Sequence, residues 1–381
     1  MWAVAGLAAG VAVVLYTIAG YPLLLAIWRR RAAPAVRKDM GFRPTVSILL
    51  AVLDGEAFLR AKLESLLALR YPAEMLDILV VSDGSTDGTD AIARSFAGRG
   101  VRLLRVPRGG KAAALNAGLE RAAGEILFLT DVRQPLDADA LAHLAANFAD
   151  PSVGVVTGEL RYLGPESAGE QADMELYWRY ELWARRRHSE IDSMFGATGC
   201  ICAIRRALVD PLPPDALTDD AVLPLRAFFR GYRVVFDPAA IAYDYPAAEG
   251  TEFRRRLRTL AGLWQVCLHM PELFTGANRM RLHFLSHKFS RLALPWAILL
   301  VCAATLALDD SPFRTFLLIA EATGVLLALV DALVPKKFPL KRLTSPARTF
   351  MSMNAAALLS ITVFFVRPAT LWRTTRVKVR P

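Results

Sequence analysis

The sequence predicts an α/β domain, built on a mixed but mostly parallel sheet with helices on both faces and flanked by transmembrane helices. Two observations predict this fold class. From Pro44 to Leu160, short continuous apolar runs alternate with helical patterns, which is typical of strands buried on both faces. Long apolar stretches gather near the two ends of the chain, and they approach the roughly 20 residues that a helix needs to cross a bilayer.

The strand-like runs place three aspartates where a parallel sheet binds ligands. Five runs are expected, at residues 45–52, 76–83, 101–106, 125–131 and 153–160. Ligands bind at the carboxyl ends of such strands, which makes Asp54, Asp83 and Asp131 candidate binding residues. The sequence has no G-x-G-x-x-G and no Walker A pattern, so neither a dinucleotide site nor a P-loop is indicated.

Four segments are candidates for crossing a membrane. Trp2–Trp28 carries no formal charge and is followed by basic residues, which favours a retained anchor over a cleaved signal peptide. Leu292–Leu308, Phe313–Val334 and Phe350–Val366 are apolar enough to span. The first and last of these three are near the short limit, and a buried hairpin or an interfacial segment is the alternative for each.

The basic charge of the chain lies beside these apolar segments. Arg29–Arg43, Lys336–Arg348 and Arg367–Pro381 are each net +5, so the remainder is net −5 although the whole chain is +10. This pattern fits loops facing the cytoplasm and anionic lipid, and it argues against nucleic-acid binding. The basic tail would lie outside after three C-terminal spans, so either one segment does not cross or the charge rule fails for this chain.

Neither cysteines nor histidines form a metal-binding pattern. The chain has four cysteines and five histidines, none at zinc-ligand spacing, and free thiols in a reducing compartment are expected. These residues are Cys200, Cys202, Cys267, Cys302, His143, His188, His269, His283 and His287.

Two glycine-containing segments suit a nucleotide. In Ser82–Asp90, Thr86 or Asp87 is expected to cap the following helix, whereas Asp83 stands at the strand tip. Lys111 follows a glycine pair and begins a helix. Backbone N–H groups, the helix dipole and a lysine together suit a diphosphate, and an ordinary capped helix is the alternative.

Three further carboxylates need an explanation. Asp131 ends a buried strand, where it requires a partner. That partner is expected to be a divalent cation shared with a diphosphate, with a helix cap or a salt bridge to Arg133 as alternatives. Asp219 and Asp220 precede a helix. Both acids cap this helix, or one of them is a general base while Thr218 provides the cap.

The order of these features, in a membrane-anchored α/β domain, resembles that of the family 2 glycosyltransferases, which include relatives of cellulose, chitin and hyaluronan synthases. The resemblance covers about Pro44–Gln265. It implies a GT-A fold and transfer of a sugar with inversion of configuration. Membrane segments flank the catalytic domain in that group as they are expected to do in this chain.

The resemblance implies roles for the donor-binding residues. "AVLDGE", at Ala51–Glu56, stands where the family has a P-x-Y-N-E-E-like segment and brings Asp54 into the donor site. Asp83 is similar to the nucleotide-contacting aspartate, and Lys111 to the donor-binding lysine. Asp131 resembles the first acid of the D-x-D motif, which holds a metal ion.

The resemblance also implies acceptor and catalytic residues. "GATGCICAIRR" is similar to the acceptor segment, with Gly199 and Cys200 at its centre. "TDD" looks like the T-E-D motif, whose last acid is the catalytic base, here Asp220. Asp219 would cap the helix, position its neighbour, or raise the pKa of that neighbour through like-charge proximity.

Four positions depart from the family's motifs: Arg133, Asp219 in place of the usual Glu of T-E-D, Arg255 in place of the Gln of Q-x-x-R-W, and Thr259. Arg133 replaces the second acid of D-x-D, so Mg²⁺ or Mn²⁺ is held by Asp131 with diphosphate oxygens, or Arg133 partly substitutes for the charge of the cation. "RRLRT" resembles Q-x-x-R-W, which contacts the donor diphosphate and would involve Arg255 and Arg258. Thr259 stands at the place of its Trp, which weakens the case for a processive polymerase.

The expected protein is a multi-pass enzyme of the bacterial plasma membrane. It has an anchor at 1–28, a cytoplasmic GT-A domain at 44–270 and membrane segments at 292–366. It moves a sugar from a nucleoside-diphosphate sugar, with UDP as the expected nucleotide, to a glycan or lipid-linked hydroxyl. The aromatic and charged helices expected at 172–191 and 252–267 lie at the lipid headgroups or cover the sheet. The alternative function is an inactive scaffold in a polysaccharide assembly complex.

Overall fold

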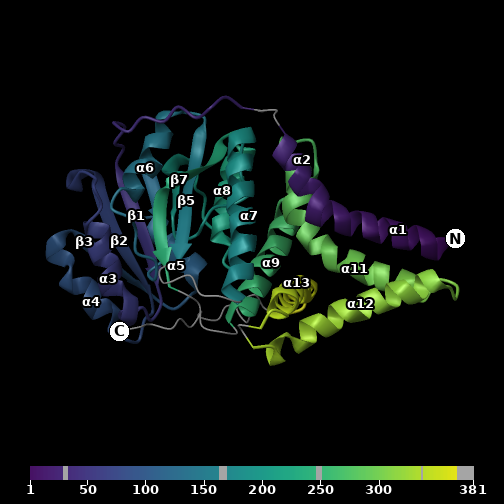
Figure 1. Cartoon of the computed structure of the whole chain (residues 1–381). Coiled ribbons are helices and arrows are strands. Elements are labelled where there is room, and N and C mark those ends of the chain that lie inside the picture. Colours follow the sequence, from purple (N-terminus) through teal and green to yellow (C-terminus); the bar gives the residue numbers. More distant parts are fainter. Residues whose placement is uncertain (29–32, 163–169, 246–250, 336–337, 367–381) are drawn as a thin grey trace. The chain divides into compact units, whose positions relative to one another are not determined.

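The computed structural model describes residues 1–28, 33–162, 170–245, 251–335 and 338–366, with the backbone alone at 170–177 and 251 (Figure 1). These residues form two compact units. The apolar unit comprises Met1–Arg29, Pro165–Ala184 and Glu249–Arg367, and the sheet unit comprises Arg30–Gly164 and Arg185–Ala248. The basic tail at 367–381, and parts of the other two basic stretches, lie outside the described residues.

The sheet unit contains a seven-stranded mixed sheet in the order β3-β2-β1-β4-β6-β5-β7. Four of the neighbouring pairs are parallel, and β6 runs antiparallel to both β4 and β5. The strands are β1 (Val46–Val52), β2 (Leu76–Asp83), β3 (Val101–Val106), β4 (Ile126–Leu129), β5 (Val153–Tyr162), β6 (Cys202–Arg205) and β7 (Arg233–Asp244). The predicted mostly parallel sheet is confirmed, and β6 was not expected.

The central strands are buried on both faces, as their continuous apolar runs predict. Leu49 of β1 lies opposite Leu79 of β2 and Leu129 of β4, and all three side chains are buried. Helix α4 packs on β2 and β3, α5 packs on β1 to β3, and both α6 and α8 pack on β5 and β7. The helices of this unit are α3 (Glu56–Leu67), α4 (Thr89–Ser95), α5 (Lys111–Leu119), α6 (Ala140–Ala146) and α8 (Asp219–Phe229).

The apolar unit is helical, and α7 (Glu170–Ile191) crosses the boundary between the units. The predicted helices at 172–191 and 252–267 are present as α7 and α9. The helices of this unit are α1 (Trp2–Leu15), α2 (Tyr21–Ile27), α9 (Thr251–His269), α10 (Arg281–Phe284), α11 (Ser290–Leu306), α12 (Pro312–Val330) and α13 (Lys341–Leu359), with π-helical turns at Tyr16–Gly20 and Leu285–Phe289.

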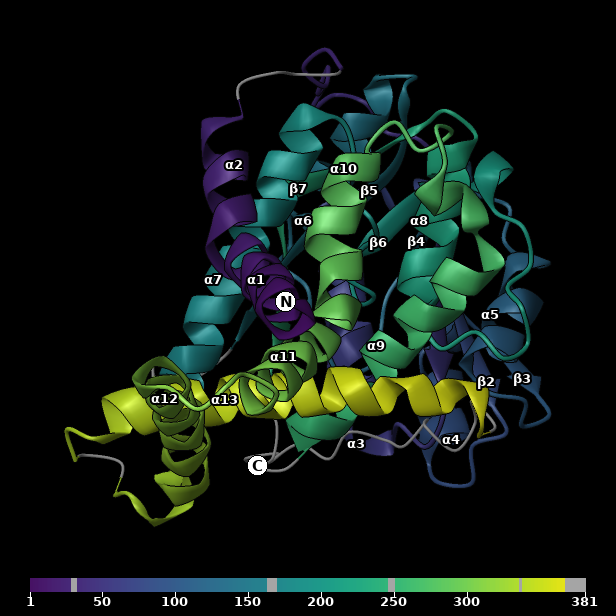
Figure 2. The same cartoon turned by 90° about the vertical axis from the view of Figure 1, so that its right-hand side faces the viewer.

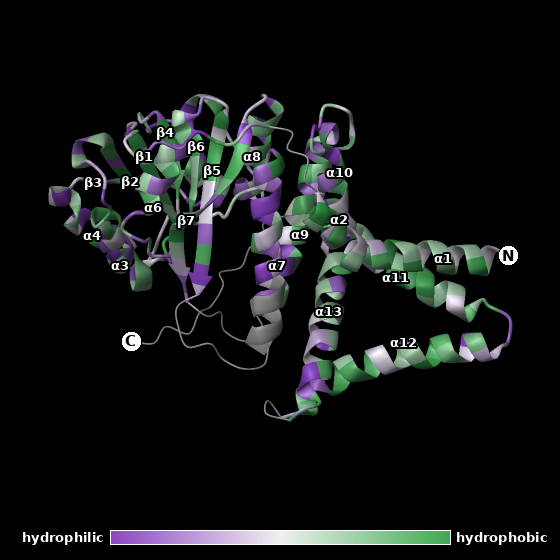
Figure 3. Ribbon diagram, turned by 45° about the horizontal axis from the view of Figure 1, so that its top comes forward, coloured by the Kyte–Doolittle hydropathy of each residue, from purple (hydrophilic) through white to green (hydrophobic). Residues whose placement is uncertain are grey.

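Four helical segments among the described residues are long and apolar enough to cross a membrane. They are Trp2–Ile27, Arg281–Leu306, Pro312–Leu333 and Lys341–Phe364. The second and fourth start about ten residues earlier than the apolar runs did, because each helix continues into a polar stretch. Hydrophobic residues predominate along α1, α11 and α12 in Figure 3. The predicted number of candidate spans is therefore confirmed, with corrected starting points.

Helices α1 and α11 pack along one another (Figure 1), and Figure 2 views α1 from its N-terminal end. Gly10 makes this close approach possible, because an added Cβ would lie 2.7 Å from Val301 Cγ2 and 3.0 Å from the Ala297 carbonyl oxygen. Small residues allow the same close packing between membrane helices.

Candidate functional site

Asp83, at the end of β2, fixes the loop that leads into α5. Its carboxylate accepts hydrogen bonds from the backbone N–H of Gly109 at 2.7 Å and of Gly110 at 2.9 Å, and the side chain is buried. Gly110 has φ +88, a conformation that favours glycine. Asp83 thus places the first residue of α5, which is Lys111. Its predicted contact with a nucleotide stays a prediction.

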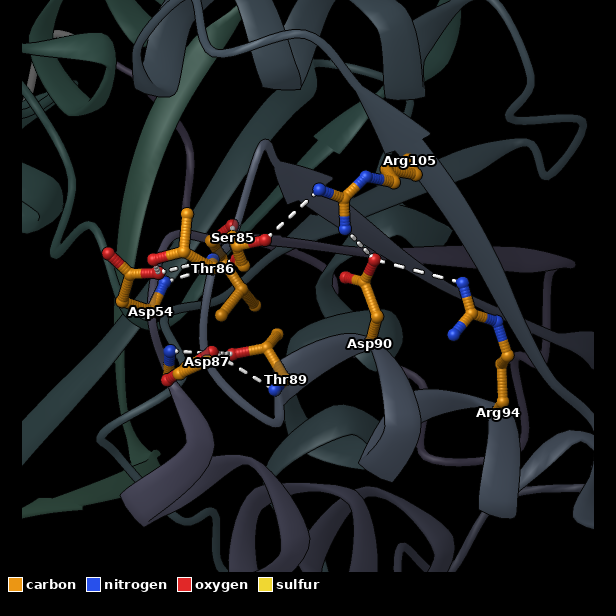
Figure 4. A network of polar contacts seen from close by, with 10 residues as sticks. Asp54, Ser85, Thr86, Asp87, Thr89, Asp90, Arg94 and Arg105 are labelled. Atoms are coloured by element: carbon orange, nitrogen blue, oxygen red, sulfur yellow. Dashed lines mark hydrogen bonds and ion pairs between the residues drawn. The ribbon is translucent and has the colours of Figure 1, made fainter.

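Asp54 joins the loops that follow β1 and β2 (Figure 4). Its carboxylate accepts from the backbone N–H of Thr86 at 2.8 Å, and its own N–H donates to Ser85 Oγ at 3.1 Å. Asp87 accepts from the backbone N–H of Thr89 at 3.0 Å, at the first turn of α4, but the N-cap residue is Gly88 and not the expected Thr86 or Asp87. These bonds hold the carboxyl ends of two neighbouring strands in one arrangement.

Lys111 lies between two of the predicted carboxylates. Its Nζ is 3.0 Å from Asp131 Oδ1 and 3.1 Å from Asp219 Oδ2. Burial opposes the charge of Lys111, but Asp131, Asp219 and Asp220 outweigh this effect and raise its pKa. Burial likewise opposes ionisation of Asp131, and Lys111 outweighs it so that the pKa of Asp131 is lowered. The site is therefore charged, with one ammonium shared by two carboxylates.

Arg133 pairs with Asp244, so the alternative in which it pairs with Asp131 is wrong. Arg133 Nε is 2.8 Å from Asp244 Oδ1, and Nη2 is 2.9 Å from Oδ2. Gln134 Nε2 donates to the same Asp244 Oδ2 at 2.9 Å. Asp244 is 1% exposed, so this arginine neutralises a buried carboxylate at the end of β7.

Asp219 and Asp220 form the first turn of α8, beside the predicted acceptor segment. Thr218 occupies the N-cap position of this helix, as expected, but its side chain makes no capping hydrogen bond. The backbone N–H of Ala197 donates to the carbonyl oxygen of Asp220 at 2.7 Å. A Cβ added at Gly199 would lie 3.4 Å from Asp220 Oδ2. The structure thus brings the predicted base and the centre of the acceptor segment into contact.

The remaining predicted residues are Cys200, Arg255 and Arg258. Cys200 has a buried thiol, and burial raises its pKa to about 12. Its acceptor role stays a prediction. Arg255 and Arg258 lie on α9, in the apolar unit. Their donor contacts also stay predictions.

Lys62, on α3, was not predicted. It is 1% exposed, and burial lowers its pKa to about 7. Its Nζ donates to Thr130 Oγ1 at 2.7 Å and to the Gln134 carbonyl oxygen at 2.5 Å. The sequence does hold a signal, because Lys62 falls within the apolar stripe formed by Leu59, Leu63 and Leu66.

Comparisons with known proteins show what the chain is similar to. Residues 47–212 match the family model "Glycosyl transferase family 2". The chain is 27% identical over 269 residues to "Probable glycosyltransferase YdaM" of Bacillus subtilis (strain 168), covering 67% of this chain and 63% of the relative. It is 26% identical over 231 residues to "Poly-beta-1,6-N-acetyl-D-glucosamine synthase" of Staphylococcus aureus (strain COL), covering 58% and 55%. The match thus spans less than two thirds of either relative.

A solved structure shares the fold over almost the whole chain. It is "Mannosyltransferase PcManGT from Pyrobaculum calidifontis in complex with GDP-Man and Mn2+", with a TM-score of 0.73 and 25% identity, and the match covers 95% of this chain and 98% of that one. The expected GT-A fold is confirmed. Residues 47–212 of this chain thus match the family 2 glycosyltransferases.

Proposed function

We propose that the protein transfers a sugar from a nucleoside-diphosphate sugar to a hydroxyl group of a glycan or a lipid-linked acceptor, with inversion at the anomeric carbon. The observation that carries this proposal is the meeting of Lys111 with Asp131 and Asp219, next to Asp220 and Gly199. A cationic helix start, a metal-type carboxylate and a candidate base are the parts that this transfer requires.

Lys111 is suited to hold the diphosphate of the donor. It is the first residue of α5, where backbone N–H groups and the helix dipole favour an anion. Its ammonium already bridges two carboxylates, and a diphosphate oxygen would join or replace them. Asp83 fixes the glycine pair ahead of Lys111, so the lysine is held in place before a donor arrives.

Asp220 is the proposed general base. An acceptor hydroxyl that lies over Gly199 would come within reach of the Asp220 carboxylate, because glycine leaves that approach open. The carboxylate would take the hydroxyl proton as the acceptor oxygen attacks the anomeric carbon from the side opposite the leaving diphosphate. Asp219 contributes by holding Lys111 beside the base.

The residues at the site fit a divalent cation in part. Among the described residues, no group of three or more His, Cys, Asp or Glu side chains gathers as metal ligands. Asp131 offers a carboxylate at the end of β4 and Asp219 a second one across Lys111. Mg²⁺ and Mn²⁺ take oxygen ligands and accept substrate phosphates among them. Asp131 would hold the ion, which would stabilise the charge of the leaving diphosphate.

The nucleotide is expected to be UDP, and GDP is the competing candidate. The mannosyltransferase of the same fold was solved with GDP-Man, whereas one relative is named a poly-N-acetyl-D-glucosamine synthase. The four candidate spans support a multi-pass membrane protein. The basic residues beside the apolar segments support a sheet unit that faces the cytoplasm. The product would be a cell-surface polysaccharide or a glycolipid.

The test uses the full chain purified in detergent. UDP- and GDP-linked sugars are screened for transfer and hydrolysis, with Mn²⁺, with Mg²⁺ and with a chelator. We expect turnover of at least one donor and a loss of about 10³-fold in Asp220→Asn, since a general base contributes typically 10²–10⁴-fold. Undiminished turnover in Asp220→Asn refutes the base assignment. Failure of the wild type to bind or turn over any donor favours the inactive scaffold.

A further inference from the structure

Lys62 lies at a position where the burial of a lysine side chain destabilises the fold. It sits in the apolar stripe of α3 and is 1% exposed. Burial of a lysine costs free energy unless its nitrogen is hydrogen-bonded. Both of its described hydrogen bonds go to one loop, at Thr130 and Gln134.

That loop carries the metal-type acid of the proposed site. Thr130 precedes Asp131 directly, and Gln134 follows Arg133. A single side chain thus holds both ends of a five-residue turn, one through a hydroxyl at 2.7 Å and one through a backbone carbonyl at 2.5 Å. The position of Asp131 against Lys111 depends on how this turn is held.

The same hydrogen-bond chain reaches the acceptor segment. Thr130 Oγ1 donates its only proton to the carbonyl oxygen of Cys200 at 2.7 Å, so this hydroxyl must accept from Lys62. Cys200 follows Gly199, whose Cα faces the carboxylate of Asp220. These hydrogen bonds lead from Lys62 through Thr130 to the backbone at Cys200, next to the glycine that lies against the proposed base.

We propose that Lys62 is a positioning residue. Through Thr130, it fixes the position of Asp131, the proposed metal-binding acid, relative to the acceptor segment at Gly199. The proposal rests on the proposed function, because it concerns the geometry of that site. It does not make Lys62 a catalytic group, since its nitrogen bonds to the protein and not to the reacting atoms. A misplacement of about 1 Å at a reacting centre can cost on the order of 10²-fold in rate.

The experiment compares Lys62→Met, Thr130→Val and the double variant in the full chain in detergent. Met keeps the length of the side chain and removes its hydrogen-bond donors. Per folded enzyme, we expect kcat to fall about tenfold or more in each single variant, with no further loss in the double variant, because both break the same chain. Thr130→Ser keeps the hydroxyl and is expected to retain at least about half of the wild-type kcat.

Lys38→Met is the matched control. Lys38 Nζ also bonds within the sheet unit, to Asp237 Oδ2 at 2.6 Å. Its described hydrogen-bond partners do not belong to the loop at 130–134. This variant is expected to lower the melting temperature and to leave kcat unchanged. If Lys62→Met and Thr130→Val lower only the melting temperature, or if their losses in kcat multiply in the double variant, the proposal is overturned. If Lys62→Met does not fold, the comparison of kcat between Thr130→Val and Thr130→Ser tests the proposal.

A second readout separates this proposal from the proposed function. Binding of UDP and GDP is measured by calorimetry with and without Mn²⁺. Lys62→Met is expected to weaken the Mn²⁺-dependent part of nucleotide binding about tenfold or more, whereas Lys38→Met leaves that part unchanged. A wild type that binds nucleotide without transferring sugar refutes the proposed function while this comparison still decides on Lys62. A wild type that binds neither nucleotide refutes both.

Discussion

Arg133, in the loop after β4, forms a bidentate ion pair with Asp244. Its Nε is 2.8 Å from Oδ1 and its Nη2 is 2.9 Å from Oδ2. Asp244 is buried and also accepts from Gln134. The guanidinium at the place of the second D-x-D acid therefore neutralises a protein carboxylate. This pairing disfavours the view that Arg133 supplies the charge of a missing cation, and it makes the loop that carries Asp131 part of the folded core.

Arg133→Asp is expected to destabilise the protein without restoring a two-acid metal site. The new acid would face Asp244, and an unpaired buried charge costs about 3 kcal/mol or more. We expect a lower melting temperature and no gain in Mn²⁺ affinity. Adding Asp244→Asn should recover much of the lost stability, because it removes the repulsion. Tighter Mn²⁺ binding at an unchanged melting temperature would show that the arginine alone blocks the site.

Lys111→Met is expected to have opposite effects on metal and on nucleotide. Without the shared ammonium, Asp131 and Asp219 face each other as unneutralised carboxylates. Free Mn²⁺ should bind more tightly, while the affinity for UDP or GDP and the rate of transfer fall, the rate by about 10²-fold. Calorimetry with metal alone and with nucleotide alone measures both. Lys111→Arg, which keeps the charge, is the control, and weaker binding of free Mn²⁺ to Lys111→Met would contradict the expected arrangement.

The parts of the fold that could be predicted are those that local sequence patterns indicate. Apolar runs identified β1 to β5, and polar residues at their ends identified Asp83 and Asp131. Strand β6, Cys202–Arg205, was missed because its residues belong to the segment that was interpreted as the acceptor site. One partner of Lys111, Asp219, and the partner of Arg133, Asp244, each stand about a hundred residues away in the chain, and no local pattern links them. Lys62 interrupted an apolar stripe, which is visible in sequence but is equally typical of a solvated helix edge.

The stability of the protein should rise with pH between about 7 and 10.5 through Lys62. Burial lowers its pKa from 10.5 to about 7 in the folded chain, so in this window the unfolded chain binds a proton that the folded chain does not. The cost of burying the charge is present in full below pH 7 and disappears above pH 10.5. We expect the melting temperature of Lys62→Met, relative to wild type, to decrease from pH 7 to pH 9.5. A constant difference would contradict the lowered pKa.

Glu181 of α7 is expected to stabilise the apolar unit through buried ion pairs. Its carboxylate is 2.6 Å from Arg291 Nη2 and 3.2 Å from Lys288 Nζ, and the residue is 3% exposed. Glu181→Gln leaves these cations without their counter-charge, which costs about 3 kcal/mol.

The same carboxylate gives a pH test. Burial opposes its ionisation, but Arg291, Lys288 and His287 outweigh burial and hold the pKa of Glu181 well below 4.5. Its contribution is therefore present above pH 4.5 and is lost as the pH falls through the folded-state pKa. The melting temperatures of wild type and Glu181→Gln should differ at pH 7 and converge as the pH is lowered. A pH-independent difference would show that packing, and not charge, explains the loss.

Two glycines beside Asp220 are expected to respond differently to alanine. At Gly199 a Cβ would make ordinary contacts of 3.4 to 3.7 Å, all with the Asp220 side chain, so Gly199→Ala should fold with an unchanged melting temperature. Its methyl group would cover the carboxylate on the acceptor side, and we expect the KM for the acceptor to rise or kcat to fall by about tenfold. Gly196 has φ +141, and its Cβ would lie 3.2 Å from the Asp220 carbonyl oxygen. Gly196→Ala should therefore lower the melting temperature through backbone strain. Measured side by side in the full chain, full activity in Gly199→Ala would mean that the acceptor does not approach Asp220 over this glycine.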